Sequence, residues 1–68
     1  MKIPKYIQVL IDQREKYAIK YVEADYRLSE WLDKHNIMVM DYDIYGGCES
    51  IVNPTDSANR IKEAIKNS

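Results

Sequence analysis

The feature that most constrains this chain is a long stretch, residues 5–35, that contains neither glycine nor proline. Pro4 precedes it and suits the first position of a helix, where a missing N–H is tolerated. Acid-before-base pairs four residues apart, which support a helix, recur along it. These pairs are Asp12–Lys16, Glu23–Arg27 and Glu30–Lys34. Asn36 suits a left-handed C-cap, with Ile37 placed to contact Leu32. We therefore predict one continuous helix over residues 4–35.

A seven-residue repeat of mostly apolar side chains runs along this predicted helix, with two charges inside it. Its members are Ile7, Ile11, Arg14, Ala18, Tyr21, Asp25, Leu28 and Leu32. A helix of this length would measure about 48 Å, whereas a compact chain of 68 residues has a diameter of roughly 28 Å. The helix must therefore break or project onto another chain. Because the sequence offers no helix breaker, we favour projection.

Antiparallel pairing of two copies would bury this repeat, and we call its residues the oligomer seam. With a two-fold axis between Ile19 and Lys20, Arg14 of one copy meets Asp25 of the other, and apolar residues meet apolar residues. A buried polar pair of this kind can fix the register of an interface. We predict a homodimer through the long helix. The alternative is that the same stripe packs on the last helix and the hairpin of its own chain.

The period of the sequence changes after this helix. Over residues 37–52 successive side chains alternate between two faces, which is typical of a strand, and Gly46-Gly47 has the composition of a tight hairpin turn. In this register one face is apolar and the other faces water. The apolar face consists of Met40, Tyr42, Ile44 and Ile51, and the wet face carries Asp41, Asp43 and Ser50.

A short final helix is predicted over residues 54–66. Asn53 is a favoured N-cap residue and Pro54 fits the next position. Apolar residues follow at helical spacing: Ala58, Ile61 and Ile65. The whole chain is thus predicted to be one α+β domain over residues 1–68. It has a long N-terminal helix, a two-stranded β-hairpin and a short C-terminal helix, and it dimerises through the long helix.

Composition excludes several classes of function. The formal net charge is −1, which disfavours nucleic-acid binding, and no apolar run approaches the ~18 residues of a membrane span. Cys48 and His35 are the sole cysteine and histidine, too few for a zinc site with about four ligands. No triad or pair of carboxylates in an apolar setting is present. We expect no catalytic residues, no metal and no cofactor, and we expect a cytoplasmic protein, where a lone thiol is normal.

Tyrosine dominates the aromatic residues, with six tyrosines, one tryptophan and no phenylalanine. Tyrosine is enriched at protein interfaces, so we predict a partner-binding surface. It combines the hairpin turn with a second apolar stripe of the long helix. Its residues are Tyr42, Asp43, Tyr45, Gly46, Gly47, Glu49, Ile19, Val22 and Tyr26.

The run DYDIYGGCESIVNP, residues 41–54, behind a Met-Lys-Ile-Pro start, resembles small proteins of Gram-positive phages and prophages. This resemblance implies an accessory protein that binds and inhibits a host protein, such as a defence-system component, and it implies no catalytic or binding residue. An alternative is a nucleotide-binding or nucleotide-sequestering protein, with tyrosine rings stacked on bases. A second alternative is a nucleic-acid-binding regulator, which the net charge disfavours.

Overall fold

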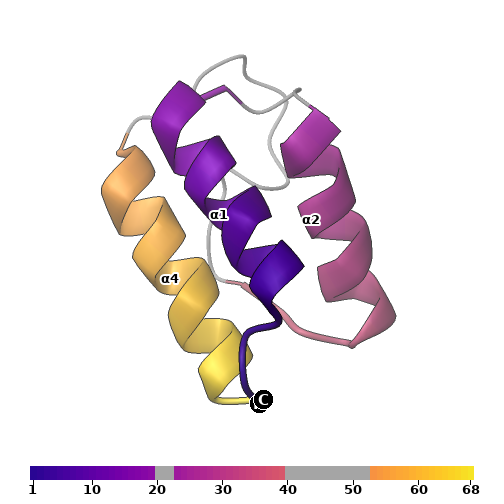
Figure 1. The fold of residues 1–68 in the computed structure, drawn as a ribbon. Helices are drawn as coiled ribbons and strands as arrows, with labels where there is room; N and C mark the ends of the chain where they lie inside the picture. Colours follow the sequence, from indigo (N-terminus) through magenta and orange to yellow (C-terminus); the bar gives the residue numbers. More distant parts are fainter. Residues whose placement is uncertain (20–22, 40–52) are drawn as a thin grey trace.

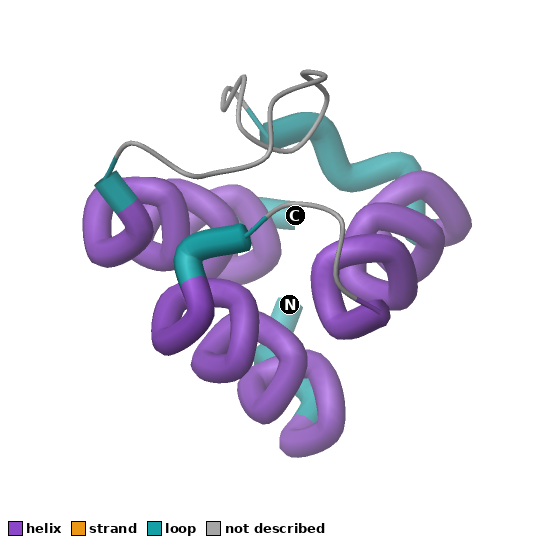
Figure 2. Tube along the Cα trace, turned by 90° about the horizontal axis from the view of Figure 1, so that it is seen from above, coloured by secondary structure: helices purple, strands orange, loops and turns teal. Residues whose placement is uncertain are grey.

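The described part of the chain forms three helices around one core. The computed structural model describes residues 1–19, 23–39 and 53–68. Helix α1 spans Lys5–Tyr17, α2 spans Glu23–Lys34 and α4 spans Pro54–Lys66. Helix α1 packs against both other helices, which lie on either side of it (Figures 1 and 2). The longest dimension of the molecule is 29 Å, so the fold is as compact as its length allows.

The core lies where the three helices meet the segment that follows α2. Its buried apolar side chains are Ile7, Ile11, Leu28, Trp31, Leu32, Ile37, Val39, Ala58, Ile61 and Ile65. Ile37 and Val39 come from the loop after α2, which runs on the side opposite α1 (Figure 2). They close the open side between α2 and α4. Because burial of each large aliphatic side chain contributes about 1.5–3 kcal/mol, this cluster is the main source of stability.

The predicted continuous helix over residues 4–35 is wrong, because α1 ends at Tyr17 and the chain turns back into α2. Ala18 adopts the left-handed conformation, with φ 53° and ψ 34°. Its backbone N–H donates to the carbonyl oxygen of Arg14 at 2.9 Å. For a residue with a β-carbon this conformation costs roughly 1–2 kcal/mol. The turn lets the apolar faces of α1 and α2 share one core, and burial of those side chains outweighs the cost.

The predicted α+β fold is also wrong, because the described residues form three helices and no strand. In the part of the predicted hairpin that the structure describes, Ile37 and Val39 are buried and Met38 is 85% exposed. The buried residues are therefore the odd-numbered ones, opposite to the predicted apolar face. Alternate burial requires only an extended segment against a core and no partner strand, which explains the misleading pattern. Residues 40–52 lie outside the described part of the chain.

The end of α2 confirms a local prediction. Asn36 has a positive φ of 55°, and its N–H donates to the carbonyl oxygen of Asp33 at 3.1 Å. The N–H of Ile37 donates to the carbonyl oxygen of Leu32 at 3.0 Å. These two bonds define a Schellman motif, and its usual apolar contact is present because Ile37 and Leu32 belong to the same core.

Helix α4 begins and ends where the sequence predicts. The side-chain oxygen of Asn53 accepts a hydrogen bond from the N–H of Asp56 at 3.0 Å, which caps the first turn. Pro54 lies in the first turn, where backbone N–H groups have no partner within the helix, so its missing N–H costs no hydrogen bond. The predicted apolar stripe of this helix is buried in the core: Ala58, Ile61 and Ile65.

Replacing Ala18 by glycine should stabilise the protein by about 1 kcal/mol, because glycine adopts a left-handed conformation without the steric cost of a β-carbon. Urea unfolding followed by the fluorescence of Trp31, the sole tryptophan and a core residue, measures this change.

The matched control is Ala64→Gly within α4, a right-handed helical position, where glycine should destabilise by roughly 0.5–1 kcal/mol. Equal destabilisation by both substitutions would show that Ala18 is not left-handed in solution.

Candidate functional site

A buried charged network joins the three helices. The Nε of Arg14 donates to Oδ1 of Asp25 at 2.6 Å, and Nη1 of Arg14 donates to the hydroxyl oxygen of Ser57. All three residues are buried, with Arg14 only 1% exposed. Asp25 lies in the first turn of α2, and Ser57 lies close to the start of α4. One side chain of α1 therefore holds the beginnings of both other helices.

The structure brings the predicted oligomer seam together within one chain rather than between two copies. Arg14 and Asp25 pair as expected, but intramolecularly. The apolar seam residues Ile7, Ile11, Leu28 and Leu32 are all fully buried in the core. Ala18 lies at the turn, and Tyr21 is outside the described residues. The predicted long helix between two copies is wrong, because α1 ends at Tyr17 and the apolar seam residues are covered by their own chain. The homodimer itself stays a prediction.

The network is incompletely satisfied by the described residues. Nη2 of Arg14 is buried and has no hydrogen-bond partner in this part of the chain. Burial of a guanidinium is costly even when it is paired, so such a network adds little net stability. Its directional bonds instead select one arrangement of the helices. The network therefore has a structural role: it fixes how the three helices are arranged.

Chemistry-bearing groups are sparse in the part of the chain that the structure describes. Within it, no group of three or more histidine, cysteine, aspartate or glutamate side chains is placed to hold a metal ion. The ring of His35 packs on that of Trp31, with 4.3 Å between the centroids. Cys48 lies outside the described residues. Among the described helices, none combines the length and the apolar character needed to cross a membrane.

Several large apolar side chains lie outside the core. They are Met1, Tyr6, Val9, Tyr17, Ile19, Tyr26 and Met38. Single exposed apolar side chains are ordinary on a protein surface. The exposed side chains that indicate a binding site are those that line a hollow together, because a partner would contact them at the same time.

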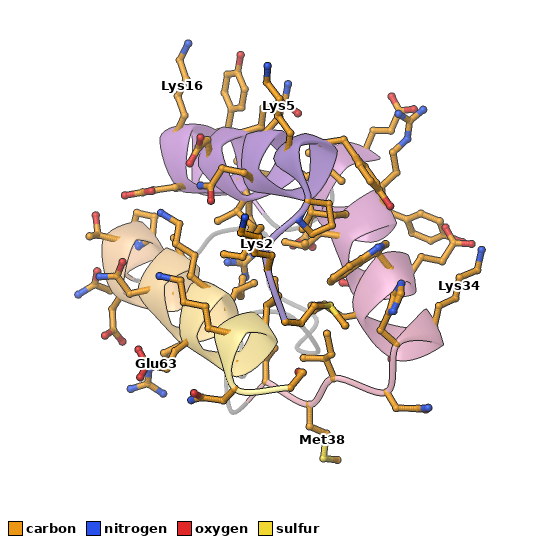
Figure 3. All side chains as sticks on the ribbon, turned by 60° about the horizontal axis from the view of Figure 1, so that its bottom comes forward. Lys2, Lys5, Lys16, Lys34, Met38 and Glu63 are labelled. Atoms are coloured by element: carbon orange, nitrogen blue, oxygen red, sulfur yellow. The ribbon has the colours of Figure 1, made fainter. Side chains whose placement is uncertain are left out.

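Tyr17 and Ile19 share such a hollow where α1 ends and α2 begins. It has a volume of about 310 Å³. The described residues that line it are Gln13, Tyr17, Ile19, Glu23 and Ala24, and we call it the turn groove. Tyr17 is 56% exposed and Ile19 is 44% exposed. Nζ of Lys16 lies 5.6 Å from the centroid of the Tyr17 ring, a cation–π contact. Figure 3 shows Lys16 projecting from α1 away from the core.

The turn groove has apolar walls and a polar edge. Tyr17, Ile19 and Ala24 provide the apolar surface. At the edge, Glu23 pairs with Arg27 one turn further along α2. The volume is at the small end of ligand sites and leaves room for one large side chain. An apolar pocket with a polar rim that accepts one anchor residue is typical of a protein–protein hot spot.

Two of the predicted partner-binding residues are described, and both are exposed: Ile19 at 44% and Tyr26 at 70%. They do not form one helical stripe, because α1 ends before Ile19. Ile19 lines the turn groove, and Tyr26 does not. The other predicted residues, Val22, Tyr42, Asp43, Tyr45, Gly46, Gly47 and Glu49, lie outside the described residues. The nucleotide-binding alternative depends on that same segment.

Sequence reasoning missed Tyr17 as a groove residue. By spacing it flanks the seam, next to Arg14 and Ala18, and a seam-flanking residue is expected to be covered. The turn at Ala18 exposes it, and no glycine or proline marks that turn.

In comparisons with known proteins, no family model, curated protein or solved structure matches this chain. No relative therefore supplies a function for the residues of the turn groove.

Replacing Asp25 by asparagine should destabilise the protein by about 3–5 kcal/mol, because the buried guanidinium of Arg14 loses its counter-charge. The total stability of a small domain is of that order, so the variant should be largely unfolded without denaturant. Trp31 fluorescence in a urea titration measures the loss.

Asp33→Asn removes the same charge from an exposed position of α2 and should change stability by no more than ~0.5 kcal/mol. If the two variants were equally stable, the Arg14–Asp25 pair would not be a buried contact of the folded chain.

Proposed function

We propose that this chain is a small non-enzymatic accessory protein, encoded by a phage or another mobile element, that binds and thereby inhibits a host protein. The observation that carries the binding role is the turn groove. Its Tyr17 and Ile19 are exposed side by side on a unit whose core and charged seam are already covered by its own chain. Support for a phage origin comes from the sequence resemblance alone.

The groove is suited to binding because its walls are held in place before a partner arrives. Tyr17 ends a helix and its ring lies under the Lys16 ammonium. Ile19 follows Ala18, whose backbone is fixed by a hydrogen bond to Arg14. Side chains ordered in advance lose less conformational entropy on association. An anchor residue of the partner that fills the groove would therefore increase the affinity of the complex with little loss of conformational entropy.

The predicted residues from Tyr42 to Glu49 remain part of the proposed partner surface. Their support is compositional: two tyrosines, Tyr42 and Tyr45, stand close to Gly46-Gly47 in the sequence, and tyrosine is frequent in hot spots. The proposed compartment is the host cytoplasm, for which the support is the single cysteine.

Site-specific photocrosslinking tests the turn groove directly. p-Benzoylphenylalanine at position 17 replaces one aromatic side chain by another, and it should give a discrete adduct with one host protein after irradiation of Gram-positive cells. Adding Ile19→Ser should reduce that adduct about tenfold, the loss expected for a hot-spot contact of ~1.4 kcal/mol. The measurement is the adduct yield on a gel, with the adduct identified by mass spectrometry.

The matched control places the same probe at Lys34, an exposed position at the opposite end of α2 (Figure 3), where no such adduct should form. The same adduct from both positions, or a yield that Ile19→Ser leaves unchanged, would contradict binding through the turn groove. Because Ile19 is partly exposed, its replacement should leave the protein folded, which circular dichroism checks.

A further inference from the structure

A second hollow, between α4 and the segment that follows α2, has a different chemistry from the turn groove. It has a volume of about 460 Å³. The described residues that line it are Met38, Asn59, Arg60, Glu63, Ala64 and Asn67. We call it the α4 groove. None of its described lining residues lines the turn groove, so the two surfaces can be tested separately.

Met38 is presented at the α4 groove by its neighbours. Ile37 and Val39 are each 5% exposed and belong to the core, whereas Met38 between them is 85% exposed. Figure 3 shows Met38 pointing away from the helices. The two core residues fix the backbone of Met38, while its unbranched thioether side chain can adapt to different apolar contacts. This arrangement offers a partner an apolar side chain at a defined position.

The electrostatics of the α4 groove favour a cation. The Nε of Arg60 pairs with Oδ2 of Asp56 at 3.0 Å, so the positive charge of the lining is already balanced. The carboxylate of Glu63 has no ion-pair partner among the described residues. The C-terminal end of α4 already holds a cation, because the N-terminal ammonium of Met1 donates to the carbonyl oxygens of Lys66 at 3.2 Å and Ser68 at 3.0 Å. The carboxylate of Glu63 is therefore the group of this groove that would attract a further cation.

We propose that the α4 groove binds a lysine or arginine side chain presented by a partner protein. The aliphatic stem of that side chain would lie along Met38 and Ala64, and its cationic head would lie at Glu63. Long basic side chains bind in this way because stem and head have different chemistry. The side-chain amides of Asn59 and Asn67 each carry both donors and an acceptor, and they suit the backbone of the segment that bears the basic residue.

Methyl NMR with two small probes tests this proposal on the intact chain. Nα-acetyl-lysine methylamide carries the stem and the charge, and Nα-acetyl-norleucine methylamide carries a matched stem alone. The lysine probe should shift the methyl signals of Met38 and Ala64 saturably, and the norleucine probe should bind more weakly. Glu63→Gln should weaken the lysine probe about two- to fivefold, as expected for an exposed ion pair, and should leave the norleucine probe unchanged.

Glu30→Gln, at an exposed position of α2, is the matched control and should leave both titrations unchanged. Equal binding of the two probes, or a lysine affinity that Glu63→Gln does not alter, would overturn the proposal. So would spermidine binding more than tenfold tighter than the lysine probe, because the occupant would then be a small polyamine. Ile19→Ser should not affect these titrations, so the result is independent of the turn groove.

Discussion

A single arginine, buried where the three helices meet, is the constraint on which the rest of the structure depends. Apolar side chains alone permit several packings of similar energy, whereas the guanidinium of Arg14 donates in fixed directions, to Asp25 and to Ser57. Both bonds form only when α2 and α4 begin beside the end of α1. That requirement stops α1 at Tyr17 and reverses the chain at Ala18. The same reversal leaves the turn groove on the surface, so one buried contact determines both the fold and the candidate interface.

The parts of the fold that could be predicted are those set by local hydrogen bonds. The ends at Asn36 and Asn53 follow from side chains and turns within a few residues, and both were predicted correctly. The break at Ala18 could not be predicted in this way, because the residues of the seam are arranged symmetrically about the point between Ile19 and Lys20. A hairpin that turns at that point and an antiparallel pair of long helices bury the same residues, including the pairing of Arg14 with Asp25. The one sequence-based indication of a break was length, since a 48 Å helix exceeds a globule of about 28 Å.

The candidate surfaces were less predictable than the fold, because tertiary packing decides which apolar side chains stay outside. Ile19 was predicted to be a contact residue from a helical stripe that does not exist, and it is exposed because the turn places it there. Met38 has the same parity in the sequence as Met40, Tyr42 and Ile44 of the predicted apolar strand face. It is exposed because Ile37 and Val39 enter the core instead, which depends on where α2 and α4 lie. Periodicity gives the spacing of the side chains that share one face of an extended segment. It does not say which of the two faces packs against the core.

The most direct test of the central claim, that the seam closes within one chain, is the distance between the two helix ends that the turn brings together. Nitroxide labels at positions 5 and 34, both exposed, would be introduced after Cys48→Ser and diluted into an excess of unlabelled protein, so that pulsed electron paramagnetic resonance reports distances within one molecule. A closed helical hairpin predicts a single distance population shorter than the 29 Å longest dimension of the fold. A distance of roughly 44 Å, the separation of these positions along one continuous helix, would contradict the intramolecular pairing of Arg14 with Asp25.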